Sequence, residues 1–102
     1  MEPHGGRFPF ENEEGRELTF EIAPSAHQAM VTGGVWDEVN AQLGTNFDEY
    51  EGDRVAPEVG LRLAPLLRKL AADRPELSTT MRRLADFVES AAVAGRDSWA
   101  DL

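Results

Sequence analysis

The acidic segment 46–58, NFDEYEGDRVAPE, contains the residue types and spacing in this chain that most resemble a binding site. Gly52 and Glu58 are spaced like the sixth and twelfth positions of an EF-hand calcium loop. The first ligand position would then fall on Phe47, which has no oxygen to offer, and Pro57 would lie inside the loop. We therefore predict no metal site here, and no cofactor.

The same segment is better suited to contact with another protein. Aromatic rings surrounded by charge are frequent at the energetic centres of interfaces, where the charge guides the encounter and the ring is buried. The candidate partner-binding residues are Phe47, Asp48, Glu49, Tyr50, Glu51, Asp53 and, near the C-terminus, Trp99. The alternative is that Phe47 or Tyr50 anchors the segment to the core while the acids face water.

Residues typical of catalysis are sparse. Besides His4 near the N-terminus, the chain has only His27, and Ser25 lies two residues before it. Two residues apart on a helix point in different directions, so this spacing does not predict a nucleophile and its base. We expect His27 at the surface or in a capping region. Gly33 and Gly34 lack the pattern of a phosphate-binding loop and are expected to turn the chain. No catalytic residue is predicted, and the chain is not expected to be an enzyme.

The composition indicates one small globular domain. The chain has 102 residues, of which 41% are hydrophobic and 28% charged. We assign residues 7–102 to this domain and expect residues 1–6 to be a mobile N-terminus. The absence of cysteine excludes disulfides, thiolate zinc sites and thiol catalysis. The N-terminal residues lack the pattern of a secretory signal, and the longest uncharged run, 22–36, is too polar to span a membrane. A cytoplasmic location is therefore predicted.

The negative charge belongs to one half of the chain. Residues 1–53 hold 12 acids and 2 bases, a balance of −10, whereas residues 54–102 hold 7 acids and 8 bases, a balance of +1. Binding to nucleic acid is disfavoured because phosphate contacts require clustered Lys or Arg. Such a field suits a basic protein partner, or serves solubility alone.

A β-hairpin is predicted at the start of the chain. In its second arm Leu18, Phe20 and Ile22 alternate with polar residues, which is the period-2 pattern of a half-buried strand. In its first arm Phe8 and Phe10 share a face. Pro9 between them cannot donate a hydrogen bond, so we expect this arm to be an edge strand or only an extended segment.

Short amphipathic helices are expected after the hairpin. The first is predicted to open through a capping box formed by Ser25 and Gln28, and the second covers residues 35–43. The third begins near Pro57, and Pro65 in its interior predicts a kink near Leu61 or a division into two helices. The last helix presents an apolar face over residues 77–92, and a tail follows that is expected to dock through Trp99 and Leu102. The predicted fold is α+β, an N-terminal hairpin packed against three or four helices.

These patterns favour a small acidic, non-catalytic protein-binding module that contacts a basic partner. Inhibitors and immunity proteins of nucleic-acid-degrading toxins are comparable in charge alone. The alternative is an accessory or structural subunit that forms homodimers through the faces of its last two helices, with the charge serving solubility. A second alternative is an enzyme that uses carboxylates from the acidic half.

Overall fold

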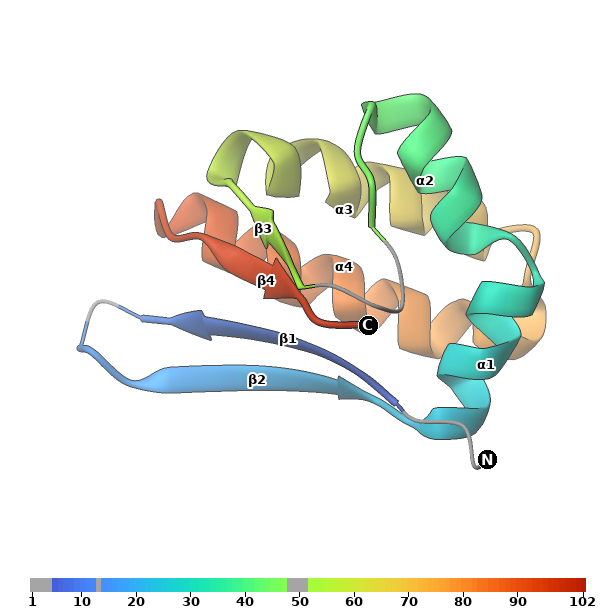
Figure 1. Ribbon diagram of the computed structural model, residues 1–102, viewed down its shortest axis with the longest axis horizontal. Helices are drawn as coiled ribbons and strands as arrows, with labels where there is room; N and C mark the ends of the chain where they lie inside the picture. Colours follow the sequence, from blue (N-terminus) through green and yellow to red (C-terminus); the bar gives the residue numbers. More distant parts are fainter. Residues whose placement is uncertain (1–4, 13, 48–51) are drawn as a thin grey trace.

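The computed structural model describes residues 5–12, 14–47 and 52–102. The strands are β1 (Gly6–Glu11), β2 (Glu17–Ile22), β3 (Asp53–Val55) and β4 (Ser98–Ala100). The helices are α1 (Pro24–Thr32), α2 (Val35–Leu43), α3 (Pro57–Ala71) and α4 (Ser78–Val93), with the 3-10 turn η1 (Pro75–Leu77) before α4. Figure 1 shows α3 and α4 behind the strands and α1 and α2 beside them. The predicted α+β fold, with its N-terminal hairpin, is confirmed.

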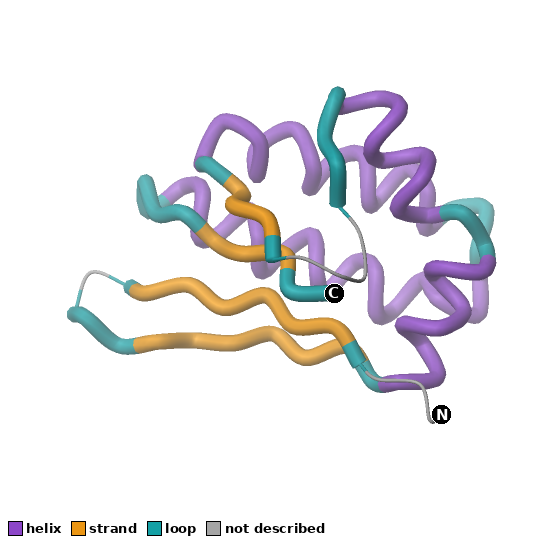
Figure 2. Tube along the Cα trace, in the orientation of Figure 1, coloured by secondary structure: helices purple, strands orange, loops and turns teal. Residues whose placement is uncertain are grey.

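The strands form one antiparallel sheet in the order β2-β1-β4-β3. Figure 2 shows this sheet as a single layer, in which β1 and β4 lie side by side although they come from opposite ends of the sequence. The expectation that the first hairpin arm lies at an edge or is merely extended is wrong, because β1 pairs with β2 on one side and with β4 on the other.

Pro9 is accommodated inside the sheet because the β1–β4 ladder is sparse. The Arg7 N–H donates to the Asp101 carbonyl (2.8 Å), and the Asp101 N–H donates to the Arg7 carbonyl (2.9 Å). The next paired position is Phe10 with Ser98. This register sets Pro9 opposite Trp99, where its missing N–H costs the ladder one hydrogen bond.

The hairpin register separates the apolar side chains from the charged ones. On the helix side the paired positions are Gly6 with Ile22, Phe8 with Phe20, and Phe10 with Leu18. The alternate residues of every strand point the other way, to a face that we call the outer face. The outer face is made of Arg7, Pro9 and Glu11 of β1, Glu17, Thr19 and Glu21 of β2, Arg54 of β3, and Trp99 and Asp101 next to it on β4 and its extension.

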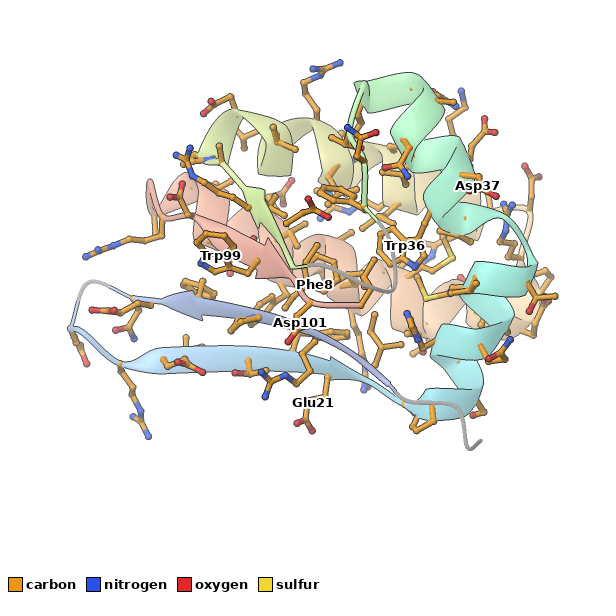
Figure 3. The ribbon with its side chains drawn as sticks, viewed as in Figure 1. Phe8, Glu21, Trp36, Asp37, Trp99 and Asp101 are labelled. Atoms are coloured by element: carbon orange, nitrogen blue, oxygen red, sulfur yellow. The ribbon has the colours of Figure 1, made fainter. Side chains whose placement is uncertain are left out.

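Aromatic rings join the sheet to the helices. The Phe8 ring, fully buried, stacks against Trp36 of α2 with ring centroids 5.9 Å apart. Closer to the β2 edge, Phe87 of α4 packs against Phe10 and Phe20, at centroid distances of 5.1 and 5.7 Å. Figure 3 shows Phe8 and Trp36 inside the molecule. Ring pairs of this kind contribute beyond the area that they bury.

The predicted apolar helix stripes form the rest of the core. Trp36 and Val39 of α2, Leu63, Leu66, Leu67 and Leu70 of α3, and Met81, Leu84, Ala85 and Val88 of α4 are all buried. The helices α3 and α4 approach closely at Gly60, where a Cβ atom would lie 3.1 Å from the Ala92 Cβ and 3.2 Å from the Val88 carbonyl oxygen. Glycine at this position allows the two backbones to meet.

Two details of the helices differ from what the sequence allowed. α3 runs from Pro57 to Ala71 as one helix with Pro65 inside it, so the division into two helices is wrong, while the kink near Leu61 stays a prediction. Burial of its leucine stripe outweighs the single hydrogen bond that the proline removes. α1 begins at Pro24, and no side-chain cap closes its N-terminus, so Ser25 and Gln28 do not form a capping box. The side-chain amide of Gln28 instead donates to the Thr32 hydroxyl (3.2 Å).

The chain ends are held more firmly than the sequence pattern suggests. Gly6, assigned to the mobile N-terminus, is buried as the first residue of β1, while residues 1–4 lie outside the described part of the chain. The tail docks as β4, a strand that the sequence analysis missed along with β3. Leu102 is buried at 3% exposure, as expected for a docking residue. None of the helices in the described ranges has the length and apolar character needed to cross a lipid bilayer.

Candidate functional site

The acidic segment is only partly visible. Asp48, Glu49, Tyr50 and Glu51 lie outside the described residues. The described residues on either side of this gap, Phe47 and Asp53, therefore carry what the structure says about the predicted docking segment.

Phe47 belongs to the core and not to a docking surface. Its side chain is 4% exposed and meets Trp36 edge to face, with ring centroids 6.2 Å apart. The Asn40 side chain fixes the backbone here, because its Nδ2 donates to the Phe47 carbonyl (2.9 Å) and its Oδ1 accepts from the Phe47 N–H (2.8 Å). The assignment of Phe47 as a partner-binding residue is therefore corrected: its ring anchors the segment, which was the stated alternative.

Asp53 also faces away from the outer face. It is the first residue of β3, half-buried and paired with Ala100, and it alternates with Arg54. Its neighbour two residues on, Val55, is 1% exposed on the helix side of the sheet. Because residues two apart in a strand share a face, Asp53 lies on the helix side as well. Among the acids predicted as contact residues in this segment, Asp53 is the one that the structure describes, and it does not share a face with the acids of the hairpin.

Of the three predicted contact residues that the structure describes, Trp99 is the one that lies on the outer face. It is 46% exposed, between Pro9 on β1 and Arg54 on β3. Figure 3 shows its ring on the side of the sheet opposite α3 and α4. Inward-facing Ser98 and Ala100 on either side of it are buried. A large aromatic ring thus lies on an inner strand, on a sheet face that no described helix covers, and exposed rings of this kind are frequent at interface hot spots.

Two ion pairs border Trp99. The Arg7 Nη2 lies 3.3 Å from the Asp101 carboxylate. Glu21 is the residue opposite Arg7 in the register of the hairpin. On the other side, the Arg54 guanidinium donates to both carboxylate oxygens of Asp97 at 2.8 and 3.1 Å. These hydrogen bonds lower the pKa of Asp97 below its ordinary value. The charges nearest the ring are therefore paired with one another.

The carboxylates of Glu11 and Glu17, at the other end of the hairpin, are not neutralised by basic partners among the described residues. Glu11 and Glu17 are directly opposite one another across the hairpin. Within the described part of the chain neither carboxylate forms an ion pair. Asp97 continues the same row toward β4. We call Glu17, Glu11 and Asp97 the acidic row.

A surface hollow lies between the acidic row and Trp99. Its volume is about 350 Å³, and we call it the Trp99 hollow. Its walls include the Trp99 ring, Pro9, the three acids of the acidic row, and Arg96, which is half-buried. Arg96 forms no ion pair with a described carboxylate. The hollow thus combines an apolar wall with excess negative charge.

His27 is buried, contrary to the expectation of a surface position. It is 2% exposed in α1, and a Cβ atom on Gly6 would lie 3.2 Å from its Cδ2. Such a side chain is out of contact with solvent and with the outer face. Among the described residues, no group of three or more His, Asp or Glu side chains has the arrangement to hold a metal ion.

Several residues of the outer face were not identified from the sequence as one surface. They are Arg7, Pro9, Glu11, Glu17 and Arg54, and Asp97, just before β4, lies next to them. The sequence does contain one indication of this surface, the alternation in the C-terminal tail. Residues 98, 100 and 102 are apolar or small, and residues 97, 99 and 101 are charged or aromatic. This pattern predicts a strand with Trp99 on its polar face.

Comparisons with protein-family models, with curated proteins and with solved structures found no match to this chain.

Proposed function

We propose that this chain is a small acidic, non-catalytic protein-binding module that contacts a basic partner protein through its outer face. The observation that carries the proposal is the exposed Trp99 ring, 46% accessible, at the centre of a sheet face that no described helix covers. The acidic row beside it supplies the charge complementary to a basic surface.

The outer face has the anatomy of a modest interface. Trp99 and Pro9 give it an apolar centre, and ion-paired side chains form a polar rim. Aromatic residues at the centre of a patch carry most of the binding energy in many complexes, while rim charges mainly affect the rate of encounter. Because the backbone of this face is already paired in a sheet, little backbone entropy is lost on binding.

The mechanism is electrostatic steering followed by burial of Trp99. An acidic body of net charge −9 attracts a cationic surface over roughly 10 Å at moderate ionic strength, and the ring is then desolvated against the partner. A protein of this kind masks its partner by contact, as inhibitors and immunity proteins do. The likeness to these proteins is one of charge, and the cytoplasmic location stays a prediction from the sequence.

The decisive experiment is affinity capture from a native lysate at low salt with three baits: the wild-type chain, Trp99→Ala and Leu61→Ala. Leu61 is a matched control because it is an apolar side chain of similar exposure, 51%, on α3. We expect a protein with net positive charge, identified by mass spectrometry, to be captured by the wild type and by Leu61→Ala. Trp99→Ala is expected to lose it, and the wild type to release it as salt is added.

The proposal is contradicted if no basic protein is captured, or if Trp99→Ala captures it as well as the wild type does. Far-UV circular dichroism of the Trp99→Ala bait establishes that it is folded. Loss of folding is not expected, because nearly half of this side chain already contacts solvent.

The alternative of a homodimer formed through the helix faces has less support. Among the described residues of α3 and α4, the exposed large apolar side chains are Leu61 and Val93, both near the end of the helix pair where Gly60 meets Ala92. The remainder of the two helices has no exposed large apolar side chain within the described residues. Light scattering tests this alternative: a dimer that persists in high salt and in Trp99→Ala would favour it. The third possibility is an enzyme that uses carboxylates, and a buried carboxyl group with a strongly raised pKa beside His27 would favour it.

A further inference from the structure

We infer that the Trp99 hollow is a binding site for the guanidinium group of an arginine side chain on the partner. This inference rests on the proposed function and names the chemical group recognised at its centre. It follows from the shape of the hollow, from the arrangement of its carboxylates and from the aromatic ring in its wall.

Two carboxylates of the hollow repel one another, and a cation bound between them would reduce this repulsion. Glu11 and Glu17 are directly opposite on neighbouring strands, and like charges in such a pair repel one another. Neither has an ion pair within the described residues, whereas Asp97 is held by Arg54. Two free carboxylates that face the same hollow therefore remain available for one cation.

The ring of Trp99 favours arginine over other cations. A planar guanidinium stacks on an indole face, and indole is the best aromatic partner for a cation. Its fork of N–H donors can also bind two carboxylate groups simultaneously, while a lysine ammonium is a compact and strongly hydrated charge. The volume of about 350 Å³ is sufficient for one such side chain with water.

Arg96 is a built-in competitor for the site. Its side chain lines the same hollow as Glu11 and Glu17, yet it forms no ion pair with either of them. Its positive charge lowers the local attraction for an incoming guanidinium. Neutralising Arg96 should therefore strengthen binding, which is the opposite of the effect expected from neutralising the acids.

The test is an NMR titration of the full chain with a short, blocked peptide that contains one arginine. The two tryptophans give two indole N–H signals, and the buried Trp36, 5% exposed, is an internal reference for Trp99. The same peptide with citrulline, which has the shape of arginine without its charge, and the same peptide with lysine are the comparison ligands. Salt is matched throughout.

We expect the Trp99 signal to shift and the Trp36 signal to stay in place. The citrulline and lysine peptides should bind about fivefold more weakly or worse, which is the loss expected when one charge-assisted contact is removed. The double variant Glu11→Gln/Glu17→Gln should weaken arginine binding by a similar factor, while Arg96→Gln should strengthen it about twofold or more. The control Asp73→Asn/Glu76→Gln, which removes the same charge at exposed positions between α3 and α4, should bind as the wild type does.

The inference is overturned if the hollow variant binds no more weakly than the control variant, if lysine binds as well as arginine, or if the Trp99 signal does not move. In each of these cases a basic protein captured through Trp99 would still support the proposed function. Conversely, an arginine peptide that binds the hollow when no captured protein depends on Trp99 would support the site and refute the docking role.

Discussion

The two tryptophans of this chain have opposite roles. Trp36 is 5% exposed and is packed between Phe8 and Phe47, so its ring stabilises the fold. Trp99 is 46% exposed on a three-residue strand, where its neighbours in sequence are the buried ones. The alternation of a strand decides this difference, because only every second residue of β4 can reach the helices.

At the residue scale, replacing Phe47 by alanine should destabilise the protein without affecting the docking surface. Removal of a buried phenylalanine ring costs about 3–5 kcal/mol in the free energy of unfolding, and urea denaturation measures it. Under conditions in which Phe47→Ala is still folded, it should capture the same partner as the wild type. A folded variant that loses the partner would restore Phe47 as a contact residue.

The ion pair beside Trp99 gives a prediction for pH. Hydrogen bonds from Arg54 lower the pKa of Asp97 in the folded state, so the unfolded chain binds protons more readily at acid pH. This contribution to stability is present above the ordinary pKa of an aspartate and is lost as the pH falls through the lowered one. In Arg54→Gln the pKa of Asp97, followed by NMR, should rise toward its ordinary value.

Glu89 is the internal control for this measurement. Its pKa is lowered by hydrogen bonds from Arg68, which joins α3 to α4 on the other side of the molecule. Arg54→Gln should leave the pKa of Glu89 unchanged. A shift of both groups, or of neither, would contradict the assignment of Arg54 as the cause.

At the scale of elements, Pro65 in α3 is expected to lower the stability of the protein. Pro65 is exposed inside a continuous helix, where proline is about 3 kcal/mol less favourable than alanine, although it also restricts the unfolded chain. Pro65→Ala should therefore raise the free energy of unfolding by about 1–3 kcal/mol in a denaturant titration. A destabilised variant would show that the helix packs against its neighbours only in the shape that the proline imposes.

The hairpin should gain stability when its repulsive pair is removed. In Glu17→Gln the cross-strand repulsion with Glu11 disappears, which is worth about 0.5 kcal/mol at low salt and less at high salt. Thermal unfolding at two salt concentrations measures it. If the variant were less stable than the wild type at low salt, the two carboxylates would not be repelling one another, and the argument for a bound cation would fail.

The elements that the sequence predicted well have long, regular patterns. Leu18, Phe20 and Ile22 mark β2 by their alternation, and the leucine stripe of α3 marks its buried face. The strands β3 and β4 have three residues each and exist only through pairing with each other and with β1. Such short segments carry too little local signal, and the partner that completes them lies far away in the sequence. Pro9 suggested an edge strand because nothing in the sequence indicated that the distant strand β4 would pair with β1, which makes β1 an inner strand.

At the scale of the whole molecule, the helices cover one side of the sheet and leave the other open. Part of the acidity of the N-terminal half thereby reaches the outer face, through Glu11, Glu17 and Glu21. The sequence predicted Trp99 as a contact residue but grouped it with the acidic segment. The structure groups it with the hairpin, because β4 lies beside β1. Tertiary pairing of distant strands decides which charges surround the ring.

The most direct measurement is ¹⁹F NMR of the chain labelled with fluorotryptophan, free and bound to the basic partner captured with it. The unlabelled partner gives no ¹⁹F signal, so the two ¹⁹F signals come from Trp36 and Trp99 alone. A soluble paramagnetic agent should broaden the Trp99 signal in the free chain, and complex formation should shift that signal and protect it, while Trp36 is unaffected in both states. A Trp99 signal that remains equally broadened in the complex would contradict docking through the outer face.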